Sequence, residues 1–83
     1  GQVVRRRGFD DSAFTQVNVA LGGLVRQTRL ERKLTLKNLA NRIGLSVSLI
    51  SQIEMGKTSA SISTLHKICC ALGVRLSSLF EKL

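Results

Sequence analysis

Apolar residues recur at helical spacing along most of the chain, in short runs that glycine residues separate. One run includes Leu21, Leu24 and Val25, with charged residues between its apolar positions, and predicts a helix over about residues 20–32. A second run follows Thr35, with apolar residues three, four and seven positions after its first leucine. No window alternates between apolar and polar residues, so we expect helices and no strand.

Residues that favour helix ends bound these runs. Thr35 and Ser46 are candidates for N-caps, because a hydroxyl oxygen can accept a hydrogen bond from a free backbone N–H of the first turn. Gly44 stands where a left-handed C-cap is favoured, and Gly56 is expected to end the helix that Ser46 begins. These four residues predict two short helices joined by a short turn.

The C-terminal third of the chain has the same organisation. Ser61 or Ser63 is expected to begin a further helix, and Gly73 to end it. Apolar residues within 76–80 predict a last short helix. The whole pattern therefore predicts an all-α fold, a compact cluster of four to five short helices.

The net charge of the chain indicates the class of its binding partner. The chain has 83 residues, which favours a single domain, and its 13 lysines and arginines against 5 acidic residues give a net charge of +8. A surplus of this size on a short chain favours a polyanionic partner such as nucleic acid. Trp and Tyr are absent from the sequence, which argues against single-strand binding by base stacking on aromatic side chains.

The segment from Thr35 to Gly56 combines a helix, a turn at Gly44 and a second helix, which is the order of a helix-turn-helix motif. The outward face of the second helix is expected to carry short side chains without an acid. Such side chains suit the major groove of double-stranded DNA, where glutamine can pair with adenine and an apolar group can contact a thymine methyl. The candidates for base contacts are Val47, Ser48, Ser51 and Gln52.

Basic and hydroxyl residues flank this second helix on both sides. Phosphate contacts made by such residues position a DNA-binding protein without specifying sequence. The backbone N–H groups at the start of the helix after Thr35 add to this surface. The candidates for phosphate contacts are Arg26, Arg29, Thr35, Lys37, Arg42, Ser46, Lys57, Thr58 and Ser59.

From about Leu21 to Phe80 the chain resembles the Cro/cI-type (XRE-like) helix-turn-helix regulator family. The residues that carry the resemblance are the runs LVRQTRLERKLTLKNLANRIGLSVSLISQIEMGK, ISTLHKICCALGV and LSSLF. The resemblance implies a lambda-repressor-like fold of five helices, with the third as recognition helix at about 46–54. This chain departs from the family at Ala60, where the family often has proline.

The resemblance also implies two sets of contacts within or between chains. Arg29 is expected to pair with Glu54, which would leave Arg29 oriented toward phosphate. The C-terminal helix is expected to form a two-fold dimer interface. Two-fold symmetry implies a palindromic operator with half-sites about one helical turn apart. The expected interface residues are Leu76, Leu79 and Phe80.

Residues 1–19 fall outside the resemblance and are expected to form a basic N-terminal arm that precedes the domain at 20–83. A short helix over 12–21 is compatible with this arm, but Gly22 and Gly23 leave its continuity with the next helix open. Two interpretations of the three consecutive arginines also remain open. They form either an arm that follows the DNA backbone or minor groove, or a disordered tail.

His66, Cys69 and Cys70 lie close together in the sequence. They offer at most three ligands without the paired spacings of zinc sites, so we expect a surface histidine, core cysteines, no metal and no cofactor. Adjacent cysteines do not make a disulfide framework, which favours a reduced, cytoplasmic protein. A sensor role for Cys70 requires an exposed, electropositive setting.

The sequence therefore predicts a sequence-specific double-stranded DNA-binding transcriptional regulator, most simply a repressor, acting as a homodimer in a bacterial or phage setting. An alternative is a helix-turn-helix-derived protein-interaction module such as an antitoxin or dimerisation domain. No catalytic residue set or phosphate-binding glycine loop is present, so we expect no enzyme. Whether a C-terminal sensor domain follows residue 83 is left open.

Overall fold

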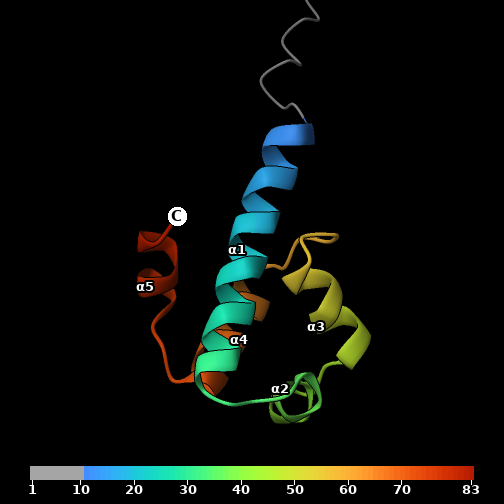
Figure 1. The fold of residues 1–83 in the computed structure, drawn as a ribbon, viewed down its shortest axis with the longest axis vertical. Helices are drawn as coiled ribbons and strands as arrows, with labels where there is room; N and C mark the ends of the chain where they lie inside the picture. Colours follow the sequence, from blue (N-terminus) through green and yellow to red (C-terminus); the bar gives the residue numbers. More distant parts are fainter. Residues whose placement is uncertain (1–10) are drawn as a thin grey trace, which may run out of the picture.

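The computed structural model describes residues 11–83, with side chains from residue 15 onward, and the first ten residues of the predicted arm lie outside this range. Five helices follow one another along it (Figure 1). They are α1 (Asp11–Glu31), α2 (Leu36–Ile43), α3 (Val47–Glu54), α4 (Ile62–Leu72) and α5 (Leu76–Glu81). No strand occurs between residues 11 and 83, and the all-α prediction is confirmed.

Helix α1 is longer than predicted, because it begins at Asp11 and continues through Gly22 and Gly23 without a break. Gly22 is buried, and a Cβ atom there would lie 2.2 Å from the carbonyl oxygen of Ile53 in α3. The absence of a side chain at Gly22 therefore lets α1 and α3 approach closely. A glycine inside a helix costs about 0.5–1 kcal/mol relative to alanine, and this close packing offsets the cost.

The continuous α1 helix crosses the predicted boundary between residues 19 and 20. Figure 1 shows its N-terminal part extending beyond the other four helices, while its C-terminal part runs through the middle of the cluster. Residues 11–19 are therefore helical and continuous with the first helix of the domain.

The hydrophobic core lies where the five helices meet. Helix α1 packs against α3, α4 and α5, while α2 packs against α3 and α4. Helix α3 is therefore held between α1 and α2. The largest fully buried side chains come from the first four helices and are Val25, Leu39, Ile50, Ile68 and Cys69.

The predicted end residues bound the helices. The Thr35 hydroxyl accepts a hydrogen bond from the backbone N–H of Asn38 at 3.0 Å, and the Asn38 side chain accepts one from the Thr35 N–H at 3.2 Å. Gly44 ends α2 with a φ of 71°, in the left-handed region. Ser46 is the N-cap of α3, and of the two serines considered for α4, Ser61 is the N-cap. These caps satisfy backbone groups that a helix end leaves unpaired.

Candidate nucleic-acid interface

Helices α2 and α3 and the turn at residues 44–46 form the predicted helix-turn-helix unit. Ile50 and Ile53 lie buried on the inner face of α3, and Ala40 of α2 is buried in the same core. Leu49 is half-buried and also packs against this core. One face of α3 is thus fixed by apolar contacts, and the opposite face is left for contact with a partner.

The buried end of α3 is held by the ion pair expected between Arg29 and Glu54. Arg29 Nε donates to Glu54 Oε2 at 2.7 Å, and Arg29 Nη2 donates to Glu54 Oε1 at 3.0 Å. Arg29 Nη1 also donates to the backbone oxygen of Leu34 at 2.8 Å. This bidentate pair therefore ties the end of α1, the following loop and the end of α3 together.

The charge of Arg29 is directed into the domain. The hydrogen bond with Glu54 raises the pKa of the Arg29 guanidinium above its ordinary value, burial acts in the opposite direction, and the Glu54 charge adds to the rise. Only 6% of Arg29 is exposed, and its contacts lie with Glu54 and Leu34. The structure therefore gives Arg29 a structural position, and we do not retain it as a phosphate contact.

The outer face of α3 has the chemistry that the sequence predicts. Val47, Ser48 and Gln52 are exposed, and Ser51 is half-buried. The only acidic residue of α3, Glu54, is buried and paired with Arg29. This face therefore presents hydroxyl, amide and small apolar groups without a negative charge, which suits contact with base edges in a major groove.

Most of the predicted phosphate contacts surround this face with accessible groups. Arg26, Lys37, Lys57 and Ser59 are exposed, and Thr58 is half-buried. The exposed hydroxyls of the N-cap residues accept backbone hydrogen bonds through their oxygens. Each of these hydroxyls still has its own hydrogen to donate, so both remain able to bind a phosphate oxygen. The N-cap residues concerned are Thr35 and Ser46.

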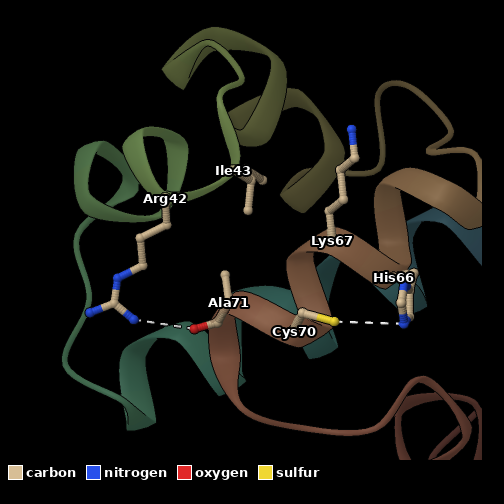
Figure 2. Close-up of a pocket in the computed structure, with 6 residues that line it drawn as sticks. All are labelled: Arg42, Ile43, His66, Lys67, Cys70 and Ala71. Atoms are coloured by element: carbon tan, nitrogen blue, oxygen red, sulfur yellow. Dashed lines mark hydrogen bonds between the residues drawn. The ribbon is translucent and has the colours of Figure 1, made fainter.

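Arg42 lies in a different place from the other predicted phosphate contacts. Its Nη1 donates to the backbone oxygen of Ala71 at 3.2 Å, and Figure 2 shows its side chain extending from α2 toward the C-terminal end of α4. A cation at the C-terminal end of a helix is stabilising, because the free carbonyl groups carry partial negative charge. Arg42 therefore links α2 to α4 through one guanidinium nitrogen, and because the residue is exposed its phosphate contact stays a prediction.

The three residues predicted for a dimer interface differ in accessibility. Leu79 is 3% exposed and belongs to the core of its own domain. Leu76 is half-buried against that core, whereas Phe80 is 36% exposed. Leu79 therefore supports the inner face of α5, and Phe80 is the residue of this set that offers apolar surface to a partner.

Two features of the site were not found by sequence reasoning. The sequence identified Gly22 only as a possible interruption, although its position four residues before Arg26 and three after Val19 places it within one helical run. The sequence also treated both cysteines as core residues. Helical periodicity with Leu65, Ile68 and Leu72 indicates that only Cys69 faces inward, and the structure agrees, because Cys70 is exposed.

Two further findings concern residues 11–83 of the chain. None of its helices is long and apolar enough to cross a membrane. No group of three or more potential metal-ligating side chains comes together within it.

The arrangement of α2 and α3 within five helices defines the class as a helix-turn-helix domain, and comparisons with known proteins agree. The family model described as "Helix-turn-helix" matches residues 25–79. Multiprotein-bridging factor 1 of Candida albicans is 36% identical over 67 residues, which are 81% of this chain and 44% of that protein. The immunity repressor protein of Bacillus phage phi105 is 36% identical over 61 residues, 74% of this chain and 42% of the repressor.

A solved structure extends the likeness to three dimensions. The clp gene regulator ClgR from Corynebacterium glutamicum superposes with a TM-score of 0.76 at 29% identity, covering 78% of this chain and 83% of that one. The chain therefore belongs to the helix-turn-helix family, in its Cro/cI-type branch of transcriptional regulators. It spans less than half the length of the two curated relatives just described.

Proposed function

We propose that this domain recognises a specific double-stranded DNA site as the DNA-binding part of a transcriptional regulator, with the outer face of α3 in the major groove. The observation that carries the proposal is the division of α3 into a fixed inner face and an uncharged, exposed outer face. An α-helix fits the width of the B-DNA major groove. Gln52 and Ser48, both exposed, are the side chains that we expect to contact bases.

Accessible cations on both sides of α3 support DNA as the partner. Lys37 lies at the start of α2 and Lys57 directly follows the end of α3, and both are exposed. Arg26 adds an exposed charge on α1. Cations in these places can bind the phosphates on either side of the groove and so set the register of α3 on the DNA. The hydroxyls of Thr35 and Ser46 are expected to add neutral phosphate contacts.

We further propose that two copies bind together to a palindromic site as a repressor. The exposed ring of Phe80 on α5 is the expected centre of the interface, with Leu76 beside it. A domain that binds one half-site gains affinity when a second copy occupies the other, and the half-sites are then about one helical turn apart.

A second candidate function is binding to another protein. The name of the Candida albicans relative, multiprotein-bridging factor, favours it. Such a function does not need the outer face of α3 to read bases, and it leaves the basic surface free to contact DNA without sequence preference.

Selection from a random pool of duplex DNA at near-physiological salt separates the two candidates. Recovered fragments are sequenced after several rounds with the 83-residue chain. The proposed function predicts an enriched, two-fold symmetric site. An enriched but asymmetric site would retain base reading and overturn the dimer. Binding that disappears with added salt and enriches no site would overturn specific recognition and favour the protein-binding candidate.

A further inference from the structure

The two adjacent cysteines have opposite environments. Cys69 is 1% exposed in the core, whereas Cys70, one residue later on α4, is exposed. Burial raises the pKa of the Cys69 thiol above its ordinary value, and the neighbouring Cys70 charge adds to the rise. Because a thiolate and not a thiol is the nucleophile, Cys69 is the unreactive member of the pair. Cys70 is accessible to a reagent in solution, because it is exposed.

Cys70 has an imidazole partner one helical turn earlier on α4. Cys70 Sγ lies 3.6 Å from His66 Nε2 (Figure 2). In the tautomer with its proton on Nδ1, the His66 ring can accept the Cys70 thiol proton through Nε2. A nucleophilic side chain with a general base in contact has the arrangement that assists proton removal during attack.

Both residues belong to the lining of a shallow groove between α2 and α4. The other lining residues are Arg42, Ile43, Lys67 and Ala71. Figure 2 shows Arg42 and Ile43 on the α2 side of the groove and the rest on the α4 side. The groove is therefore lined by two permanent cations and no carboxylate, a setting that attracts anions.

We propose that this groove binds anionic disulfides and that Cys70 exchanges with them to form a mixed disulfide. Lys67 and Arg42 would hold the anionic groups of the reagent, while His66 would accept the thiol proton. The proposal is independent of the proposed function, since none of the groove residues belongs to the outer face of α3.

The exchange needs no reactant other than the disulfide. The Cys70 thiol proton passes to His66 Nε2, and the thiolate attacks one sulfur of the reagent. A new S–S bond forms to Cys70 Sγ as the S–S bond of the reagent breaks, and the second sulfur leaves as a thiolate with the electron pair of that bond. His66 then returns its proton to solvent or to the departing thiolate.

The test measures second-order rate constants for the reduced 83-residue chain with three disulfides of different charge. The probes are dithiobis-nitrobenzoate, which is anionic, dithiodipyridine, which is neutral, and cystamine, which is cationic. Each rate constant is divided by that of free N-acetylcysteine, and mass spectrometry of peptides locates the adduct. We expect the normalised anionic rate to exceed the cationic one by about tenfold at low ionic strength and to approach it as salt is added.

Single substitutions test the roles of the groove residues in the exchange. Cys70→Ser removes the fast reaction, whereas Cys69→Ala retains it. Lys67→Gln and Arg42→Gln lower the anionic rate and leave the neutral one near that of the parent chain, while His66→Gln lowers all three rates. Lys82→Gln removes the same charge from an exposed position outside the groove and is expected to keep the anionic preference.

Three results would overturn the proposal. One is a normalised anionic-to-cationic ratio near one at low salt. Another is an equal loss of preference in Lys82→Gln and Lys67→Gln, since net charge and not the groove would then attract the reagent. The last is an adduct on Cys69 at a rate equal to that on Cys70. Thermal unfolding of each variant verifies that the rates refer to folded protein.

Discussion

The inner and outer faces of α3 differ in what holds their side chains in place. Ile50, Ile53 and Glu54 on the inner face are buried by α1 and the core, and Glu54 is held by two hydrogen bonds from Arg29. Gln52, on the outer face, is exposed. On the proposed function, one short helix separates stability from recognition, so substitutions on the two faces should change different measured quantities.

The largest expected effect is on the inner face, at the ion pair. Arg29→Ala leaves the buried Glu54 carboxylate without its partner and removes the donor to Leu34. Breaking a buried pair in this way costs about 3–5 kcal/mol, which chemical denaturation would measure as a lower free energy of unfolding. Arg26→Ala, an exposed arginine on the same helix, is the matched control and should change stability by less than about 0.5 kcal/mol. Equal losses in both variants would contradict the structural position of Arg29.

The second largest expected effect on stability concerns the close approach of α1 to α3. Substitutions at two adjacent glycines test this approach. In Gly22→Ala the new Cβ meets the backbone of Ile53 and Glu54, whereas at Gly23 nothing lies within 4 Å. We expect Gly22→Ala to destabilise by about 1–3 kcal/mol. Gly23→Ala is expected to stabilise by about 0.5–1 kcal/mol through helix propensity. Thermal unfolding of the pair gives the comparison, and a stabilised Gly22→Ala would show that the helices are not in contact there.

A smaller effect on stability is expected at the start of α2. Thr35→Ala removes the hydroxyl that accepts from the Asn38 N–H and should cost about 1 kcal/mol. Thr35→Ser keeps the hydroxyl and is expected to restore most of the loss in the same unfolding measurement. If the serine variant is as unstable as the alanine variant, the methyl group and not the cap carries the effect.

The smallest effect concerns the surface around the outer face. Lys37→Ala should leave stability unchanged, weaken binding to the selected site and to random DNA alike, and lower the salt dependence of log K by about one unit. Titrations over a range of salt concentrations measure this slope. A loss confined to the selected site would indicate that Lys37 contacts a base and not a phosphate.

Sequence reasoning succeeded where a feature is local. The caps at Thr35, Gly44 and Ser46 are set by side-chain chemistry and backbone conformation within one turn, and the structure confirms them. The exposed face of α3 follows from helical periodicity within eight residues. These signals do not depend on distant parts of the chain.

The contacts that sequence reasoning did not find join residues far apart in the sequence. A residue without a side chain is needed at position 22 because the backbone of Ile53 lies close to Gly22. The sequence around Gly22 gives no sign of this contact. Arg42 was grouped with the phosphate contacts by its charge, and its hydrogen bond to the Ala71 carbonyl, 29 residues away, has no local signal in the sequence. Charge and propensity predict which elements form, and tertiary packing decides which side chains they present.

On the proposed function, the outer face of α3 reads bases while its inner face only holds the helix in place. The most direct test measures affinities of the Gln52→Ala chain for the selected DNA site and for a scrambled duplex, beside the same measurements on Gln16→Ala, an exposed glutamine on the far part of α1. We predict that Gln52→Ala loses about 1–3 kcal/mol on the selected site at one base position, with unchanged affinity for the scrambled duplex and unchanged stability. Equal losses on both duplexes, or none, would contradict the claim.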